Sequence, residues 1–527
     1  MTLDSRKRPR PARTSVVMQT APIVHIDGTN LTLDLVNRIA TDRVGVALDA
    51  RALPRIAAAR EVVERAVASN GRIYGVTTGF GRLKNVRIDP TEATELQRNL
   101  ILSHACGVGE PLPWAAARAS MLLRAHSLAR GYCGVRVEVI ALLIELLNRN
   151  VTPVIPSQGS VGCSGDLAPL AHMALVLIGE GEAWVGNERV NGKTALERAG
   201  LLPLTLSFKE GLSLINGTQI MTGIGALALV RADNALRAAD ITGAMSLEAY
   251  FGTDSAFAER INALRPHHGQ AHTAANIRRL LQGSGVLASH RDCDRVQDPY
   301  SFRCMPVVHG AARDTLRFAH NTLDIEINSV TDNPIIFADD SSLVSNGNFH
   351  GGPVGLALDY AKIALTDASS IAERRIDKLL FGAEGLPPFL TERFGLCSGY
   401  MLAQYTAAAL VSENKTLSTP ASVDSIPTSA GQEDHNSMGT IAARQCASVV
   451  ANYETVVAIE LLVAAQALDF RKPHAFGRGT GCAHRLIREH VTHLGADRNL
   501  SQDVEAALDL VRSGKLVAAV ESEIGAL

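Results

Sequence analysis

Residues 159–172 combine small residues, an acid and a proline in an order that permits unusual backbone chemistry. They read Gly-Ser-Val-Gly-Cys-Ser-Gly-Asp-Leu-Ala-Pro-Leu-Ala-His. The small residues Cys163, Ser164 and Gly165 would let the Gly165 nitrogen reach the Cys163 carbonyl carbon and close a five-membered ring, since glycine leaves that nitrogen unhindered. Loss of two waters, one from the Ser164 side chain, would then leave an electrophilic methylidene group. The run also fits an ordinary loop before a helix, with Pro169 in the first turn, where no intrahelical N–H is needed.

Besides the loop at 153–165, predicted loops at 71–81, 216–219, 297–303, 331–350 and 412–438 hold most of the unusual polar residues of the chain. Binding and catalytic residues are found disproportionately on loops, so function is expected where these loops meet. Seven runs lie within these loops, in chain order Tyr74-Gly-Val-Thr-Thr-Gly-Phe-Gly81, Asn216-Gly-Thr-Gln219, Gln297-Asp-Pro-Tyr300-Ser-Phe-Arg303, Thr331-Asp-Asn-Pro334, Gly347-Asn-Phe-His350, Ser412-Glu-Asn-Lys415 and Gln432-Glu-Asp-His435.

Together, and in this order, these runs resemble the motifs of the histidine and aromatic amino-acid ammonia-lyase family. The resemblance extends from about residue 23 to the C-terminus. Members form 4-methylideneimidazol-5-one (MIO) autocatalytically from a tripeptide, which here matches Cys163-Ser164-Gly165. The resemblance therefore implies an enzyme that eliminates ammonia from an amino acid with MIO and no external cofactor.

The resemblance also implies roles for individual residues. The tyrosine matching Tyr74 is commonly given the role of base for the β-proton, and those matching Tyr300 and Asn216 lie beside the cofactor. A tyrosine base requires a lowered pKa. The arginine matching Arg303 binds the substrate carboxylate, to which a planar guanidinium can donate two hydrogen bonds; the alternative is an ordinary loop arginine. Gln297, in the same run, is assigned to substrate binding.

Fewer positions bear on the choice of substrate. Ser103-His104 matches the pair of histidine-selective members rather than the His-Leu or Phe-Leu pairs of many tyrosine- and phenylalanine-selective members, although some bacterial tyrosine-active members share it. A hydrogen-bonding side chain there can hold a polar ring. Glu413 is similar to the glutamate that histidine-selective members place near the imidazole, as acceptor or base; otherwise it belongs to a solvated helix face. Phe349 is expected to line the pocket and Gln432 to hydrogen-bond near the cofactor.

The reaction implied by these matches is conversion of L-histidine to urocanate and ammonia. Three departures from the histidine-selective pattern leave room for other substrates: Cys163 replaces alanine, Gly351-Gly352 replaces Ala-Glu, and Met305 replaces glutamine. Cys163 is small enough for cyclisation, and the two glycines could enlarge the pocket. The alternatives are a lyase for tyrosine, phenylalanine or another aromatic amino acid, a 2,3-aminomutase, and an inactive helical scaffold.

The elements expected to position these loops are mainly helices. Residues 51–69, 114–129 and 135–148 are rich in helix-forming residues at helical spacing. The mostly apolar segments 220–230, 355–365 and 449–467 are typical of central helices in a large bundle. One hairpin is predicted at residues 182–190, around Gly186-Asn187.

The family resemblance adds a specific architecture to this mainly α prediction. It implies a histidase-like (fumarase/aspartase-type) long helical bundle with an N-terminal cofactor-bearing domain. We expect a disordered basic extension at 1–22, an MIO-forming domain at 23–220, and the central bundle with C-terminal helices at 221–527. Family members are homotetramers whose sites combine loops from three subunits.

Composition argues against several other classes of protein. A net charge of -2, with 46% apolar and 20% charged residues, favours neither a nucleic-acid binder nor a disordered chain. The eight scattered cysteines form no CxxC pair, no apolar segment follows the basic N-terminus, and polar residues interrupt the uncharged stretch 211–230. We therefore expect a cytoplasmic protein without membrane spans. The histidines at 267, 268 and 272, and at 484, 490 and 493, lack metal-site spacing, so no metal is expected.

Overall fold

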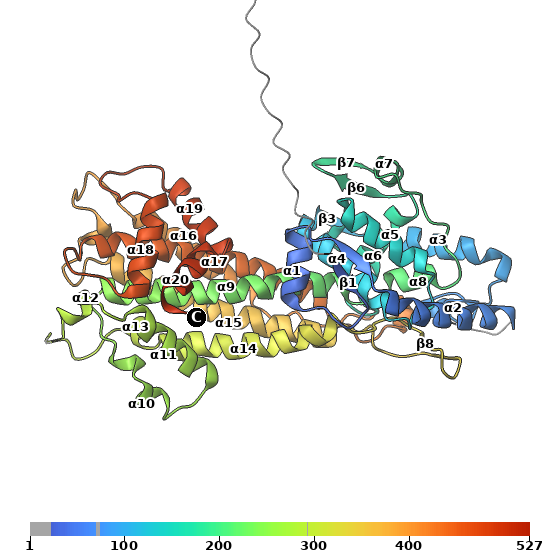
Figure 1. Ribbon diagram of the computed structural model, residues 1–527, viewed down its shortest axis with the longest axis horizontal. Helices are drawn as coiled ribbons and strands as arrows, with labels where there is room; N and C mark the ends of the chain where they lie inside the picture. Colours follow the sequence, from blue (N-terminus) through green and yellow to red (C-terminus); the bar gives the residue numbers. More distant parts are fainter. Residues whose placement is uncertain (1–22, 70–73, 292) are drawn as a thin grey trace, which may run out of the picture.

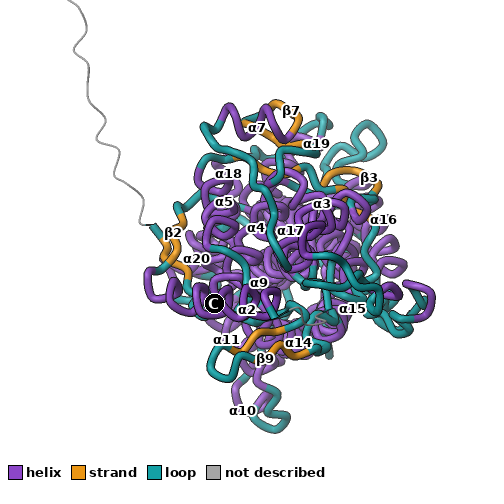
Figure 2. The backbone as a smooth tube through the Cα atoms, turned by 90° about the vertical axis from the view of Figure 1, so that its right-hand side faces the viewer, coloured by secondary structure: helices purple, strands orange, loops and turns teal. Residues whose placement is uncertain are grey.

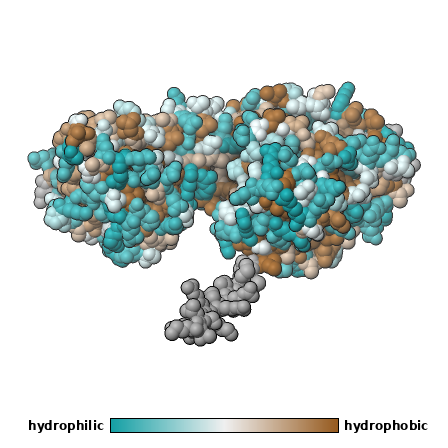
Figure 3. Space-filling view, turned by 90° about the horizontal axis from the view of Figure 1, so that it is seen from above, coloured by the Kyte–Doolittle hydropathy of each residue, from teal (hydrophilic) through white to brown (hydrophobic). Residues whose placement is uncertain are grey.

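Helices dominate an elongated molecule with a lobe at each end (Figure 1). The computed structural model describes residues 23–69, 74–291 and 293–527. The extension expected at 1–22 lies outside the described residues. Seen from above, the surface narrows between the two lobes (Figure 3).

The first eight helices belong to the lobe on the right of Figure 1. Those expected at 51–69, 114–129 and 135–148 are confirmed as α2, α4 and α5, and α4 is buried over almost its whole length. The helices are α1 (Leu33–Thr41), α2 (Leu53–Ala68), α3 (Ala93–His104), α4 (Trp114–Ala129), α5 (Val137–Asn148), α6 (Leu167–Leu177), α7 (Gly192–Arg198) and α8 (Glu210–Ile215).

The strands are short and lie at the periphery of the helices (Figure 2). The predicted hairpin is confirmed: β6 (Glu182–Val185) pairs antiparallel with β7 (Glu188–Asn191), and β4 (Val151–Pro153) joins it in the order β4-β6-β7. The remaining pairs are β1 (Val24–Ile26) with β2 (Val46–Leu48), β3 (Val108–Pro111) with β5 (Pro156–Gln158), and β8 (Ile335–Phe337) with β9 (Ser342–Val344). These pairs were not predicted, because three or four residues show too little alternation to reveal a strand.

The centre of the molecule is a bundle in which α9 (Gln219–Ala249), α15 (Gly352–Leu380) and α17 (Gly439–Asp469) pack on one another. These helices confirm the predicted central segments. Around and beyond them lie α14 (Met305–Glu326), α16 (Met401–Leu417), α18 (Arg478–His490), α19 (Leu500–Arg512) and α20 (Lys515–Ile524). The short helices α10 (Glu259–Asn262), α11 (His268–Leu280), α12 (Gly285–Ala288) and α13 (Tyr300–Arg303) lie on the left of Figure 1.

Among the described residues, α17 alone is long and apolar enough to cross a membrane. It is a core helix of the bundle, however, since most of its apolar window is buried within the protein. It also carries the fully buried Glu460, which accepts hydrogen bonds of 2.5 and 2.9 Å from Arg375 on α15. Its apolar composition is therefore explained by packing.

Candidate active site

The Cys163-Ser164-Gly165 segment forms a tight turn just before α6. Gly162 and Gly165 adopt φ of +69° and +75°, the left-handed region that favours glycine. Gly165 also lies against Gly217, such that an added Cβ would be 2.1 Å from the Gly217 carbonyl oxygen. That oxygen accepts a hydrogen bond of 2.7 Å from the Asp166 amide. Backbone conformation and close packing thus both require glycine at position 165.

Asp166 joins this turn to two bundle helices. Its Oδ2 accepts from the Ile220 and Met221 amides at 3.0 and 2.9 Å, at the beginning of α9. Its Oδ1 accepts from Ser160 Oγ at 3.0 Å and from Thr440 Oγ1 of α17. Burial raises the pKa of Asp166, and these hydrogen bonds oppose that effect. Asp166 therefore fixes where α6 and α9 begin relative to each other.

The Ser164 carbonyl oxygen faces a side-chain donor. The Asn216 side-chain amide has one orientation in which both its nitrogen and its oxygen form hydrogen bonds. In that orientation Nδ2 donates to Ser164 O at 2.9 Å and Oδ1 accepts from the Asn333 backbone amide at 3.0 Å. Asn216 is buried, with 2% of its surface exposed. A fixed donor at this oxygen stabilises negative charge that develops on it.

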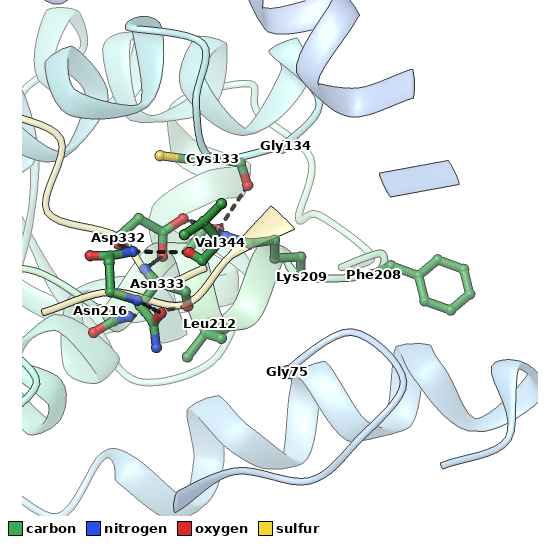
Figure 4. Close-up of polar contacts among 12 residues, drawn as sticks. Gly75, Cys133, Gly134, Phe208, Lys209, Leu212, Asn216, Asp332, Asn333 and Val344 are labelled. Atoms are coloured by element: carbon green, nitrogen blue, oxygen red, sulfur yellow. Dashed lines mark hydrogen bonds and ion pairs between the residues drawn. The ribbon is translucent and has the colours of Figure 1, made fainter. Parts of the chain in front are cut away.

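A buried ion pair lies beside Asn216 and Asn333 (Figure 4). Lys209 Nζ is 2.5 Å from Asp332 Oδ2, and both side chains are fully buried. Ser213 Oγ donates to the same oxygen at 2.8 Å, while Asp332 Oδ1 accepts from the Asn333 amide at 2.8 Å. The pair thus holds the segment that supports Asn216.

A second carboxylate reaches the turn from the loop before α17. Ser164 Oγ donates to Glu433 Oε1 at 3.3 Å, and Thr428 Oγ1 donates to Glu433 Oε2 at 2.7 Å. Backbone hydrogen bonds between Thr428 and Glu433 close this part of the loop. Burial, and then the Glu433 carboxylate, raise the pKa of the Cys163 thiol to about 12, so the thiol stays protonated at neutral pH and is a poor nucleophile.

Tyr74 lies beside these groups with its ring half-buried. Its hydroxyl accepts a hydrogen bond of 3.2 Å from the Gly81 amide, and its ring packs edge-on against Phe80. Burial and the Glu433 carboxylate raise the pKa of Tyr74, although the Gly81 contact opposes them. A single chain therefore does not provide the lowered pKa that a tyrosine base requires.

Two adjoining cavities, of about 780 and 530 Å³, converge on Ser164. Both are lined by Tyr74, Ser164, Asn333 and Glu433. The structure brings many of the predicted site residues to these cavities: the larger is also lined by Ser103, His104 and Asn216, and the smaller by Cys163, Phe349 and Gln432.

Three of these residues make contacts that bear on their predicted roles. Ser103 Oγ lies 3.1 Å from His104 Nδ1. Burial lowers the pKa of His104, so its imidazole is neutral near pH 7. Gln432 accepts from Lys84 Nζ, a contact between two loops at the cavity mouth, and its predicted role near the cofactor stays a prediction.

The structure places the other four predicted residues elsewhere in the chain. Gln297, Tyr300 and Arg303 lie at or just before α13, in the opposite lobe (Figure 1). Tyr300 is 72% exposed, and the Arg303 guanidinium lies over its ring, 4.6 Å from the centroid. The run Ser412–Lys415, predicted to lie in a loop, lies instead within α16, where Glu413 is exposed and accepts from Asn452 at 2.8 Å. Since a helix rises about 1.5 Å per residue, Asn452 is roughly 20 Å along α17 from Gly439.

Glu433 is the main site residue that the sequence prediction missed. It belongs to the run Gln432-Glu-Asp-His435, and its presence in a loop with other polar residues was the available signal. The sequence analysis assigns the carboxylate near the imidazole to Glu413, whereas the structure places Glu433, and not Glu413, against Ser164 within one chain.

The unusual glycines at 351 and 352 do not open the cavity. A Cβ on Gly351 would lie 2.6 Å from Met221 Sδ and 2.7 Å from Ser437 Oγ, so alanine there would require these two side chains to shift. Neither glycine lines the two cavities. Met305, the third departure, is buried at the start of α14. The expectation that the glycines enlarge the pocket therefore has no support in this chain.

The histidine clusters set aside in the sequence have protein partners. His484 and His493 contact Asp469 at 3.0 and 2.8 Å, and the rings of His268 and His272 contact each other. Within the described residues, no group of three or more His, Cys, Asp or Glu side chains is arranged to hold a metal ion.

Replacing Gly165 with alanine is expected to destabilise the protein by at least about 2 kcal/mol, from positive-φ strain plus the clash with Gly217. Gly186→Ala is the matched control, since Gly186 has φ of +63° but nothing within 4 Å of an added Cβ. Urea unfolding of both variants measures the difference. Equal losses of stability would show that the contact with Gly217 is unimportant.

Known proteins are similar to this chain in sequence and in overall fold. The profile described as aromatic amino acid lyase matches residues 31–489. The chain belongs to the aromatic amino acid lyase family. The chain is 52% identical to the histidine ammonia-lyase of Caldanaerobacter subterraneus over 95% of its own length and 98% of that protein. The histidine ammonia-lyase of Myxococcus xanthus is also 52% identical, over 95% and 99% of the two chains.

Solved structures of aromatic amino acid lyase relatives have the same fold. Histidine ammonia-lyase from Trypanosoma cruzi superimposes with a TM-score of 0.89 at 40% identity, covering 95% of this chain and 96% of that one. Tyrosine aminomutase from Streptomyces globisporus gives 0.91 at 38% identity, over 96% and 100%. The predicted family and the mainly α, histidase-like fold are confirmed, and the protein is a carbon–nitrogen lyase.

Proposed function

We propose that this lyase converts L-histidine to urocanate and ammonia. The observation that carries the proposal is the Glu433 carboxylate over Ser164, in a cavity also lined by Ser103 and His104. A carboxylate accepts the N–H of an imidazole ring, and such polar groups favour a polar ring over an apolar one. The curated relatives at 52% identity, which are named histidine ammonia-lyases, support the same substrate.

The residues of the turn fit the formation of MIO from Cys163, Ser164 and Gly165. Gly165 is held where only glycine fits, and the Ser164 hydroxyl lies against a carboxylate. MIO, once formed, supplies an electrophile for the amino group of the substrate. Because MIO forms from residues of the chain itself, the proposed reaction needs no external cofactor.

Side chains bind the substrate and remove its β-proton. Glu433 accepts the imidazole N–H, neutral His104 offers a further hydrogen bond, and Tyr74 takes the β-proton. An arginine binds the substrate carboxylate, for which Arg303 of another subunit is proposed. A cation brought beside Tyr74 would also lower the pKa of its hydroxyl, which burial and Glu433 raise within one chain.

We further propose a homotetramer whose sites combine loops from three subunits. Helix α13, which carries Tyr300 and Arg303, lies in the opposite lobe from α6, which begins just after the Cys163-Ser164-Gly165 turn (Figure 1). One face of α14 and α15 also exposes large apolar side chains that a partner could cover. These are Phe318, Ile325, Leu356, Tyr360 and Ile363. Light scattering should give about four times the mass of one chain.

The location and domain boundaries are also proposals. All eight cysteines lie within the described residues and carry free thiols, which supports the reducing cytoplasm. The start of α9 at Gln219 supports a boundary near residue 220, between an MIO-forming domain at 23–220 and the bundle at 221–527.

Product analysis tests the reaction. Purified protein is incubated separately with histidine, tyrosine and phenylalanine. We expect urocanate from histidine; coumarate or cinnamate as the main product would indicate a lyase for another aromatic amino acid. A β-amino acid would indicate an aminomutase, the activity named for the Streptomyces globisporus neighbour.

Replacing Glu433 with glutamine is expected to lower kcat/KM for histidine by about 10- to 100-fold, because a charged hydrogen bond contributes about 1.5–3 kcal/mol. The loss for any residual tyrosine turnover should be smaller, since a phenol ring offers no imidazole N–H. Rates are divided by the fraction of chains that have lost two waters. Glu413→Gln is the matched comparison, and a larger loss for it than for Glu433→Gln would favour Glu413 of another subunit instead.

A further inference from the structure

Two carboxylates flank the tripeptide, but only one is free to take part in its chemistry. Asp166 is fully buried, and its two oxygens already accept four hydrogen bonds, from two amides and two hydroxyls. These contacts hold α6, α9 and α17 together. Asp166 therefore acts as a structural acceptor.

Glu433 is placed differently. Its Oε2 is held by Thr428 Oγ1 at 2.7 Å, which directs Oε1 toward Ser164 Oγ at 3.3 Å. Glu433 is only partly buried and lines both cavities, so water can reach it. Glu433 thus contacts the Ser164 hydroxyl, the group that must leave as the second water, and can act on it as an acid or a base.

We propose that Glu433 is the proton donor for the dehydration of Ser164, and so catalyses the maturation of its own chain. This inference rests on the proposed function, because it requires that the tripeptide cyclises. It assigns the carboxylate a task that comes before any substrate binds.

The two water losses balance as follows. The Gly165 nitrogen bonds to the Cys163 carbonyl carbon, and the Cys163 oxygen leaves as the first water with the protons of the Gly165 and Ser164 amides. The Ser164 Cα–H bond then breaks, and its electron pair forms a double bond to Cβ as the Cβ–Oγ bond breaks. Protonated Glu433 gives its proton to the departing Oγ, which becomes the second water. The Cα proton passes to cavity water, which reprotonates Glu433, and no oxidant or reductant is needed.

The same geometry links maturation to substrate binding. Once Oγ has left, Glu433 Oε1 loses its 3.3 Å hydrogen bond from Ser164, while Oε2 keeps Thr428. The Glu433 carboxylate lines both cavities, and it can then accept the imidazole N–H of the substrate in place of the Ser164 hydroxyl. Maturation therefore prepares the site for the ring that we propose it binds.

The test follows the mass of the tripeptide-containing peptide over time in wild type, Glu433→Gln and Glu433→Ala. Wild type should lose two waters. The two variants should lose the second water at least about 100-fold more slowly, the usual scale of general acid catalysis. Asp434→Asn, at the exposed neighbouring acid, should mature like wild type.

Added formate separates catalysis from a structural role. A small acid can enter the cavity left by Glu433→Ala and should speed its loss of the second water, whereas a folding defect would not respond. Maturation of Glu433→Gln at the wild-type rate, or no response to formate, would overturn the inference. If wild type itself loses no water, the proposed function fails instead.

Discussion

Ser164→Ala is expected to reduce turnover of the favoured amino acid by at least about a thousandfold, the scale on which loss of an essential catalytic group acts. Alanine has no hydroxyl to lose, so the methylidene carbon cannot form. The peptide should then retain the mass of at least one of the two waters. The measurements are the steady-state rate and the peptide mass.

The fold should tolerate this substitution. Ser164 Oγ makes one hydrogen bond, of 3.3 Å, to Glu433, and its removal should change the unfolding midpoint little. Full turnover by Ser164→Ala would contradict the proposed chemistry.

Mixed oligomers extend this experiment to the sharing of sites. Arg303→Ala alone should lose substrate binding, because no other chain can supply the guanidinium. Coexpressed with Ser164→Ala, it should regain part of the wild-type rate, since some sites then combine an intact Ser164 from one chain with an intact Arg303 from another. No recovery in verified mixed oligomers would argue against shared sites.

The helical architecture was predictable from the sequence because, in a long helix, the regular spacing of apolar residues indicates which side chains are buried. α4 was predicted with both of its ends, and the central helices α9, α15 and α17 with their apolar cores. Their side chains face other helices over many turns, so the pattern repeats often enough to be recognised. The three-residue strands gave no such repetition.

The site was predictable only to the extent that its residues belong to recognisable motifs. Ser164, Asn216 and Tyr74 were found in this way, and they converge in the structure. Glu433 was missed because one polar loop residue resembles another until the chain is folded. The turn with Tyr300 and Arg303 illustrates a different limit, since motif order does not say which copy of the chain contributes each loop.

The buried pair of Lys209 and Asp332 could not be predicted at all. The two residues are far apart in sequence, and each is of a type that is almost always exposed. Only the fold brings them together, fully buried, beside the Asn216 segment (Figure 4). Their location suggests that they matter for both stability and catalysis.

Lys209→Met is expected to lower the free energy of unfolding by about 3–5 kcal/mol, because it leaves the Asp332 carboxylate buried without its cation. Urea unfolding at fixed protein concentration measures the loss. Arg189→Met is the matched control: Arg189 lies 2.5 Å from Glu182, but both side chains are about half exposed, so the cost should be below about 1 kcal/mol.

The double variant Lys209→Met with Asp332→Leu separates stability from catalysis. Apolar residues of similar size should recover most of the lost stability, since replacing a buried ion pair in this way is often neutral. Turnover should remain low, because the Asn333 amide loses Asp332 Oδ1 and Asn216 is then less firmly held at the Ser164 carbonyl. A double variant with wild-type turnover would show that the ion pair does not position Asn216. A Lys209→Met protein as stable as wild type would show that the carboxylate finds another partner or a proton.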